Sequence, residues 1–313
     1  MAKPFFILAP MDDVTDVVFR SVIADCAPPD MFFTEFVNVD GLCSRGRANI
    51  IHKLSINQDK DHHIVAQIWG KVPDNYRTVS SELAGMGFHG VDINMGCPAK
   101  NEVKNGCCSA LINNRDLARE IILATQEGAG DLPVSVKTRL GWNEIDLSWH
   151  EFLLGFKLNM LTIHMRTRQE MSKVPAHWDI FPEIVALRDK ISPSTKLVIN
   201  GDIEDYAHGL EVAKQTGADG VMIGRGIFKN PYCFAEVNPW PDTPKNERIA
   251  HYKKQVDLFN DTWHDVKKNP QGLKKFCKVY INGFDGATEL RDKIMRTTTA
   301  PEISDILASY LES

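Results

Sequence analysis

The stretch that decides the fold extends from residue 134 to residue 224 and holds four short runs of one kind: VSVKTR (134–139), LTIHMR (161–166), KLVIN (196–200) and GVMIG (220–224). Longer segments with helical periodicity, such as Tyr206–Thr216, separate these runs. Four similar runs precede them, at Phe5–Pro10, Met31–Phe36, Ile64–Trp69 and Gly90–Asn94. Parallel strands need crossovers of this length, so we expect repeated βα units. Eight units in about 230 residues favour a (β/α)8 TIM barrel over an open doubly wound sheet.

The composition changes after residue 237. Three prolines within residues 238–244 indicate a linker. Apolar side chains then recur at spacings of three and four, which predicts an amphipathic helix; they are Ile249, Tyr252, Val256, Phe259, Trp263 and Val266. We therefore predict a cofactor-binding barrel over residues 1–237 and a small C-terminal α-helical domain over residues 245–313.

The overall composition excludes several classes of protein. The 313 residues are 43% hydrophobic and 25% charged, which is typical of a globular chain and not of a disordered or collagen-like one. The sequence contains no run of about 18 apolar residues, so we expect no membrane-spanning helix. Seven scattered cysteines favour a reducing cytoplasm over a disulfide framework. The net charge of −5 argues against nucleic-acid binding over the whole surface.

One segment has the opposite charge. Residues 245–282 carry nine Lys and Arg against four Asp and Glu. A polyanion that contacts only this end would explain the excess, and so would a solvated helical surface.

Polar, charged or glycine residues follow nearly every expected strand. They are Met11, Glu35, Gln67, Asn94 to Cys97, Lys137, Arg139, His164, Arg166, Asn200 to Asp202, Gly224 and Arg225. The C-terminal ends of barrel strands form one rim, so these residues are expected to surround a pocket. The glycine turns after the last two strands stand where many barrels bind phosphate. We therefore expect a phosphorylated cofactor, and Lys137 and Gln67 suit the polar edge of a flavin.

Cys97 follows the fourth expected strand. A buried inert thiol is the usual state of a single cysteine, but a loop at the catalytic rim favours chemistry. An ordinary thiol is mostly protonated at neutral pH and can act as a general acid, whereas a thiolate nucleophile would need a cation such as Lys137. Cys107 and Cys108 are adjacent and complete no zinc motif, so no metal site is expected.

Six motifs occur in order along the chain: LAPMDDVTD (8–16), DINMGCP (92–98), VSVKTRLGW (134–142), TIHMRT (162–167), NGDI (200–203) and DGVMIGRG (219–226). Together with GLKKF (272–276), they resemble the flavin-dependent tRNA-dihydrouridine synthases over nearly the whole chain.

The resemblance implies an FMN-bound barrel that reduces the C5=C6 bond of a uridine in the tRNA D-loop, with NADPH as the reductant. FMN would contact Pro10, Met11, Asp12, Gln67, Lys137, His164, Asn200, Gly201, Asp202, Gly224 and Arg225. Hydride would pass from flavin N5 to uracil C6, and Cys97 would give the proton to C5. Asn94 and Arg139 would contact the uracil, whereas Arg166, Lys274 and Lys275 would contact the rest of the tRNA. A cytoplasmic monomer without a metal is expected.

Three positions depart from the family pattern. Asp13 and Cys108 stand where glycine is usual, and Met165 replaces the glycine of a His-Gly-Arg-Thr pattern. The resemblance is greatest to the branch that acts on uridine 16, although that branch has arginine where this chain has Asn38. Two other interpretations stay open. An FMN barrel that reduces a free pyrimidine or an enoate would not need the basic helical part, and a tRNA-binding module without chemistry would purify colourless.

Overall fold

A computed structural model of the chain describes residues 3–266 and 268–312. In this part of the chain, nine parallel strands form one sheet in the order β1-β9-β8-β7-β6-β5-β4-β2, and β3 also pairs with β4. The strands are β1 (Phe5–Leu8), β2 (Phe32–Phe33), β3 (Val37–Asn38), β4 (Ile64–Trp69), β5 (Gly90–Asn94), β6 (Val134–Arg139), β7 (Met160–His164), β8 (Lys196–Asn200) and β9 (Gly220–Ile223). The Leu8 N–H donates to the Met31 carbonyl at 3.1 Å, which joins β1 to the segment before β2 and closes the ring.

The (β/α)8 barrel expected from the sequence is therefore confirmed, with one difference in detail. Within the second expected strand, Met31–Phe36, only β2 (two residues) forms, and the short strand β3 follows just beyond these bounds. The Gln67 N–H donates to the Thr34 hydroxyl at 3.1 Å, so a side chain interrupts the backbone ladder between the two short strands.

The strands are buried on both faces, as parallel strands in a barrel must be. Seven buried side chains form a cluster separate from the main core: Ile7, Ala9, Phe33, Val65, Met160, Val198 and Met222. They come from strands around the ring and fill the barrel interior. Met222 also lines the cavity described below, so this cluster forms the floor beneath it.

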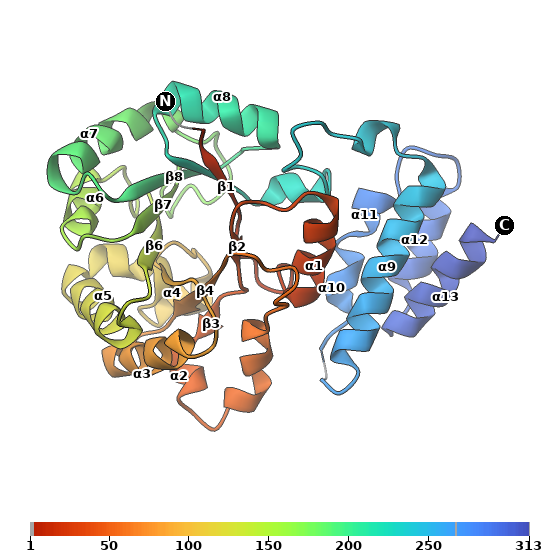
Figure 1. The fold of residues 1–313 in the computed structure, drawn as a ribbon, viewed down its shortest axis with the longest axis horizontal. Helices are drawn as coiled ribbons and strands as arrows, with labels where there is room; N and C mark the ends of the chain where they lie inside the picture. The colour runs from red at the N-terminus through yellow and green to blue at the C-terminus, as the bar shows by residue number, and fades with distance from the viewer. Residues whose placement is uncertain (1–2, 267, 313) are drawn as a thin grey trace.

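Helices surround the sheet in the first part of the chain (Figure 1). They are α1 (Val17–Cys26), α2 (Val39–Leu42), α3 (Pro73–Ala84), α4 (Lys100–Lys104), α5 (Arg115–Ala129), α6 (Leu147–Leu154), α7 (Phe181–Ile191) and α8 (Tyr206–Thr216), with 3-10 helices at Arg47–Asn49, Ile51–Leu54, Cys108–Asn113, Trp178–Ile180, Arg225–Phe228 and Trp240–Asp242. Acidic and amide side chains cap several N-termini. Asp16, for example, accepts from the Phe19 N–H at 2.9 Å at the start of α1.

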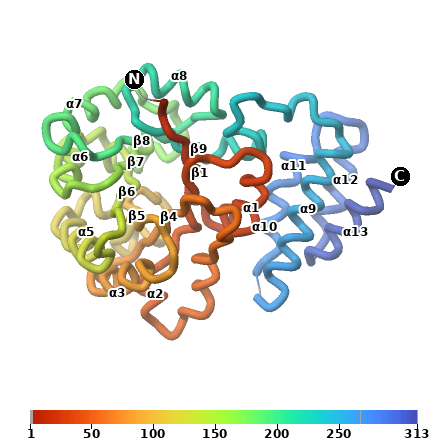
Figure 2. The backbone as a smooth tube through the Cα atoms, in the orientation of Figure 1, coloured from red at the N-terminus to blue at the C-terminus, as the bar shows by residue number. Residues whose placement is uncertain are grey.

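The last part of the chain is helical and lies beside the barrel against α1 (Figures 1 and 2). It contains α9 (Lys245–Trp263), α10 (Gln271–Lys274), α11 (Cys277–Tyr280), α12 (Ala287–Met295) and α13 (Ala300–Leu311). The amphipathic helix expected from Ile249 onward is α9, but its apolar face stops at Trp263. Val266 lies beyond the helix end and is exposed, so its inclusion in that face was wrong.

The contact between the two parts is apolar and close. The Phe276 ring stacks on Phe19 of α1 at 4.7 Å between centroids, and on Phe228 at 5.6 Å. One buried cluster continues through both parts without a break. The division into domains at 1–237 and 245–313 therefore stays a prediction. Among the described residues, no helix is both long and apolar enough to cross a membrane.

Candidate active site

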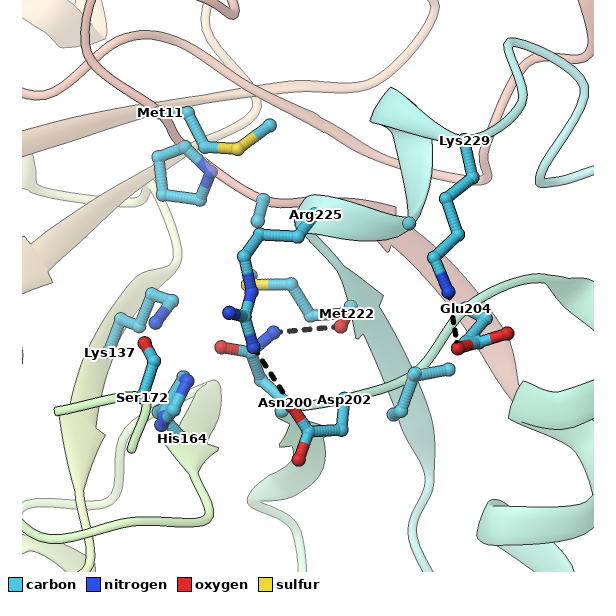
Figure 3. A pocket seen from close by; sticks show the side chains of 16 residues that line it. Met11, Lys137, His164, Ser172, Asn200, Asp202, Glu204, Met222, Arg225 and Lys229 are labelled. Carbon is cyan, nitrogen blue, oxygen red and sulfur yellow. Dashed lines mark hydrogen bonds and ion pairs between the residues drawn. The ribbon is translucent and has the colours of Figure 1, made fainter. Parts of the chain in front are cut away.

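A cavity of about 580 Å³ opens at the C-terminal ends of the strands (Figure 3). Its lining comes from β1, β6, β7, β8, β9 and the loops that follow them: Ala9, Pro10, Met11, Lys137, His164, Ser172, Asn200 to Glu204, Met222, Gly224 to Gly226 and Lys229. This volume lies in the range of pockets that hold a cofactor or other small ligand.

One end of the cavity is organised by Asp202. Its carboxylate accepts from Arg225 Nη2 at 2.9 Å and from the Ala176 N–H at 3.0 Å, and it also pairs with Arg166. Arg166 is buried, and its Nη1 has no hydrogen-bond partner among the described residues. A buried cationic donor without a partner is costly unless a ligand supplies an acceptor. This end of the cavity is therefore suited to an anionic group.

Glycine is required in the turns at the same end. Gly201 has φ +124, a conformation that L residues rarely adopt. A Cβ on Gly226 would lie 2.2 Å from the Glu204 carbonyl oxygen, so no side chain fits there. These two turns let the backbone after β8 and β9 approach a ligand closely, as phosphate sites in barrels require.

Lys137 and His164 stand at the opposite side of the cavity. In the sheet register, Lys137 lies opposite Asn94 and His164 lies opposite Asn200. Burial lowers the pKa of Lys137 to about 8, and the described residues offer its ammonium no hydrogen bond or ion pair. Burial, reinforced by Arg139, holds the pKa of His164 well below its ordinary value, so this ring is neutral. Its Nδ1 is buried without a partner in the described part of the chain.

Cys97 lies on the loop after β5, and Asn94 holds that loop in place. The Asn94 Oδ1 accepts from the Gly96 N–H at 3.1 Å and from the Cys97 N–H at 2.9 Å. Arg139 fixes the same loop from β6, because its Nε donates to the Gly96 carbonyl at 2.7 Å. A hydrogen bond with the Cys108 thiol lowers the pKa of Cys97 to about 7, although burial opposes it.

A buried chain of hydrogen bonds extends beneath this loop. Ser135 Oγ donates to Asp92 Oδ1 at 2.6 Å, and Gln67 Nε2 donates to Asp92 Oδ2 at 2.7 Å. Asn94 Nδ2 in turn donates to Gln67 Oε1 at 2.9 Å. Both amide orientations are fixed by the carboxylate at the bottom, since an acceptor there selects the donor end of Gln67. The chain therefore connects the barrel interior to the Cys97 backbone.

Comparison with known proteins shows which family the chain resembles. The dihydrouridine synthase family model matches residues 7–311. A Staphylococcus aureus protein named probable tRNA-dihydrouridine synthase is 47% identical over 313 residues, covering 99% of this chain and 94% of its own. A Bacillus subtilis protein named probable tRNA-dihydrouridine synthase 2 is 46% identical, covering 99% of this chain and 95% of its own.

This chain belongs to the dihydrouridine synthase family. Solved structures agree on the fold. Morphinone reductase superimposes with a TM-score of 0.53 at 13% sequence identity, over 73% of this chain and 84% of its own. A second structure, of the same reductase in complex with tetrahydroNAD, has a TM-score of 0.52.

Two departures of this chain from the family pattern now have a structural context. Asp13 has φ +53 and Cys108 has φ +55, in the left-handed region that favours glycine. The backbone conformation that glycine would supply is thus kept with a different side chain at both positions.

The structure does not bring every residue expected at the cofactor to the cavity. Gln67 is buried below the rim in the chain described above and does not line the cavity. Asp12 faces outward and forms an ion pair with Lys53. The carboxylates of Asp12, Asp13 and Glu35 lie within 4.8 Å of one another, and Lys53 and Lys268 already pair with this group.

The residues expected to contact tRNA differ in exposure. Lys275 is exposed, and its Nζ lies 3.5 Å from the Asp13 carbonyl at the rim of the barrel. Lys274 is only 8% exposed, and its ammonium donates to the carbonyls of Met295 at 2.9 Å and Thr297 at 2.6 Å. The structure gives Lys274 a role inside the helical part, so we withdraw it as a tRNA contact.

Several cavity residues were missed in the sequence. Ser172, Glu204 and Lys229 lie on loops, two to eight residues past a strand end or turn, where no periodic pattern marks them. Met222 could have been found, because it alternates with Val221 and Ile223 on β9 and therefore faces the barrel interior.

Proposed function

We propose that this protein is an FMN-dependent tRNA-dihydrouridine synthase that reduces the C5=C6 bond of a D-loop uridine, with NADPH as the reductant. Family membership and the names of the relatives support the activity and the substrate class. Two unpartnered cavity nitrogens, on Lys137 and His164, support a cofactor that carries hydrogen-bond acceptors.

The cavity suits FMN at both ends. Arg225 and the turns at Gly201 and Gly224 would hold the phosphate side. Arg166, expected at the tRNA, is instead buried and paired with Asp202, so we withdraw it as a tRNA contact and propose that its unpartnered Nη1 faces the same phosphate. Asp202 contributes by orienting the two arginines, since its carboxylate is already engaged with them. Lys137 would place a positive charge beside the polar edge of the ring system. Bound FMN supplies the hydride that is added to uracil C6.

Cys97 would donate the proton to C5. Addition of hydride at C6 builds negative charge toward C5 and O4, and an acid must then deliver a proton to C5. A thiol with a pKa of about 7 is both substantially protonated at neutral pH and stable after it loses the proton. Asn94 and Arg139 hold the backbone of the Cys97 loop, and we propose that they position the acid in addition to facing the uracil.

The single observation that carries this proposal is the placement of the Cys97 loop against β6, which bears Lys137. The Met95 N–H donates to the Lys137 carbonyl at 2.8 Å, so the acid loop and the cavity cation belong to one rigid unit. Cys97→Ala is expected to keep bound flavin and tRNA affinity while uridine reduction falls by about 10²–10⁴-fold, because only the proton donor is lost. Single-turnover reduction at the wild-type rate in this variant would assign the acid elsewhere.

We further propose uridine 16 as the target, because residues 34–37, 139–142 and 287–290 resemble the branch that acts there. Dihydrouridine would be mapped in tRNA from a strain that lacks the gene, with and without this protein. Dihydrouridine at another D-loop position would assign a different target uridine but leave the proposed chemistry unchanged. Free uridine serves as the substrate control, since a tRNA enzyme should leave it unreduced. We expect a monomer that works in the cytoplasm, where tRNA is available.

A further inference from the structure

A tight turn follows β1 and forms one wall of the cavity; we call residues 11–16 the Met11 turn. The Met11 carbonyl accepts from the Val14 N–H at 3.2 Å and from the Thr15 N–H at 3.0 Å, and the Met11 N–H donates to the Thr15 hydroxyl at 2.9 Å. The Met11 side chain lines the cavity (Figure 3), and a Cβ on Gly224 would lie 4.0 Å from its sulfur. The shape of the Met11 turn therefore sets the cavity wall beside the turn after β9.

Two buried carboxylates of the barrel hold the Met11 turn. Glu35, which follows β2, accepts from the Asp13 N–H at 2.7 Å in the middle of the turn. Asp16 ends the turn and accepts from the Phe19 N–H at 2.9 Å, where α1 begins. Asp13 has φ +53, and a residue other than glycine keeps this conformation only where the surrounding contacts impose it. The hydrogen bond to Glu35 is such a contact.

Lys268 of the helical part joins the two carboxylates. Its ammonium donates to Asp16 at 2.7 Å and to Glu35 at 3.2 Å, and all three side chains are at most 10% exposed. Lys53, another cation close to this group, is already paired with Asp12. Buried carboxylates that lose their cation are costly, and two of them close together repel each other. Without Lys268, the two groups that hold the Met11 turn would therefore be forced apart or toward water.

We propose that Lys268 is a positioning residue for the cofactor: it bridges Asp16 and Glu35 and thereby holds the Met11 turn in the shape that binds FMN. The helical part is then a component of the cofactor site, although none of its side chains lines the cavity in the described part of the chain. The proposal extends the function proposed above and rests on FMN as the ligand of the cavity.

A second ion pair between the two parts of the molecule provides a matched control. Lys254 of α9 donates to Asp25 of α1 at 2.9 Å, and its side chain is 61% exposed. Asp25 lies near the C-terminal end of α1, whereas Asp16 precedes the N-terminal end. Both lysines therefore connect the helical part to α1, but only Lys268 does so at the end that continues into the Met11 turn.

Hydrogen–deuterium exchange of the apoprotein, read by mass spectrometry of peptides that cover residues 11–16, measures how often the turn opens. Lys268→Met should speed exchange in this segment by about tenfold or more, because the two carboxylates that hold it lose their cation. Lys268→Arg keeps a cation that can bridge both carboxylates and should restore most of the protection. Lys254→Met should leave exchange in this segment unchanged.

Fluorescence titration of the same apoproteins with FMN tests the effect on the cofactor site. The dissociation constant should rise by about three- to tenfold in Lys268→Met, because only the fraction of molecules with a closed turn binds. It should stay within about twofold of the wild type in Lys268→Arg and Lys254→Met. Glu35→Gln weakens the contact with Lys268 but keeps an oxygen for the Asp13 N–H, so it should show both changes to a smaller extent. It takes the place of Lys268→Met if that variant does not fold.

Exchange at the wild-type rate in residues 11–16 of Lys268→Met, or of Glu35→Gln in its place, would overturn the proposal. Faster exchange confined to α9 and α13 would also overturn it, because Lys268 would then only tie the two parts together. So would faster exchange at the turn with an unchanged dissociation constant of FMN. A wild-type apoprotein that does not bind FMN would overturn the proposed cofactor, and with it the role of Lys268 in binding it. The exchange data distinguish that case from the others, because they are recorded without a ligand.

Discussion

Lys137 is a half-buried cation with no hydrogen bond or ion pair among the described residues, and this affects how a flavin should bind. Its pKa is lowered from 10.5 to about 8, mainly by burial. Below pH 8 the ammonium is charged and available to an anionic ligand, and above pH 8 it becomes neutral. A ligand that prefers the charged form therefore binds more weakly as the pH rises through about 8.

We expect the dissociation constant of FMN to be nearly constant from about pH 6.5 to 8 and then to rise by up to about tenfold per pH unit. Fluorescence titration of the apoprotein with FMN measures this. Lys137→Met should bind FMN weakly and lose the dependence on pH. Arg225→Ala should weaken binding at every pH and keep the dependence, because this variant leaves Lys137 in place. A wild-type constant that is flat up to pH 9.5 would contradict this placement of Lys137.

Asp92 is the second residue with a clear consequence. Burial raises its pKa to about 6, and its oxygens accept from Ser135 and Gln67. In Asp92→Asn, the amide oxygen can still accept from Gln67, and the amide NH2 can donate to the Ser135 hydroxyl. We therefore expect the protein to fold with near wild-type stability and to keep most of its activity. Asp92→Ala leaves the Gln67 amide unpaired, at a cost of about 1–3 kcal/mol.

Reduction of tRNA separates these two Asp92 variants. Asp92→Ala should lose activity through the loosened Cys97 loop while it retains flavin, because Asp92 and Gln67 do not line the cavity. Urea unfolding gives the stability, absorbance gives the flavin content and dihydrouridine formation gives the rate. Equal rates in the two variants would mean that the chain does not position Cys97.

At this scale the sequence predicts where a residue stands on a strand better than what its side chain contacts. His164 and Asn200 end their strands, Lys137 lies two residues before the end of β6, and all three reach the cavity, as expected from the common rim. Gln67 belongs to the same pattern, but Asp92 lies opposite it in the register and binds its amide. A cross-strand partner of this kind cannot be read from spacing, because it depends on how the barrel closes.

Among the elements, the turns after β8 and β9 decide whether the cavity can form. The two glycines of the second turn make a matched pair. A Cβ on Gly226 would lie 2.2 Å from the Glu204 carbonyl, whereas a Cβ on Gly224 would make ordinary contacts, 3.5 Å from Ala9 Cβ and 4.0 Å from Met11 Sδ.

Gly226→Ala should therefore destabilise the fold by about 1–3 kcal/mol, as overpacking does, because the backbone of one turn must move. Gly224→Ala should fold normally but project a methyl group toward the lining of the cavity, and it should weaken FMN binding with little change in stability. Thermal unfolding of the apoprotein and FMN titration distinguish the two effects. A Gly224→Ala protein that unfolds as readily as Gly226→Ala would show that both turns are equally tight.

The elements themselves follow largely from local pattern. Seven of the eight expected strand positions correspond to single strands, because a buried run between helical segments has few other conformations in a barrel. The exception is Met31–Phe36, where β2 ends before Thr34 and the Thr34 hydroxyl replaces a ladder carbonyl. The face of α9 was extended too far at Val266, since no glycine or proline marks the helix end after Trp263.

In the whole molecule, the helical part is joined to the barrel through buried charge as well as apolar packing. The Lys268 ammonium lies between the Asp16 carboxylate at 2.7 Å and the Glu35 carboxylate at 3.2 Å, and all three side chains are nearly buried. Trp263 Nε1 donates to the same Asp16 at 3.2 Å. Asp16 also caps α1, so one carboxylate connects the first barrel helix to the end of α9. This contact holds the helical part at a fixed place beside the barrel rim.

A tRNA that enters the rim would therefore meet the exposed lysines of the helical part at a defined position. Lys275 and Lys278 are exposed there, whereas Lys274 is buried against two carbonyls. Because these adjacent lysines have opposite environments, a pair of variants can test whether the basic segment binds tRNA or is only a solvated surface. Lys275→Ala removes a charge near the rim, and Lys274→Ala removes a structural hydrogen-bond donor.

We expect Lys275→Ala to weaken tRNA binding and to flatten the slope of log affinity against log salt by up to about one unit, because one phosphate contact is lost. Its stability should change by less than about 0.5 kcal/mol, as for other exposed substitutions. Lys274→Ala should instead lower stability by about 1–3 kcal/mol, since two buried carbonyls lose their donor. Its salt slope should stay that of the wild type under conditions where it is folded. Equal slopes and affinities for Lys275→Ala and the wild type would leave the basic excess of residues 245–282 as a solvated surface, and the tRNA would then have to be held by the barrel rim alone.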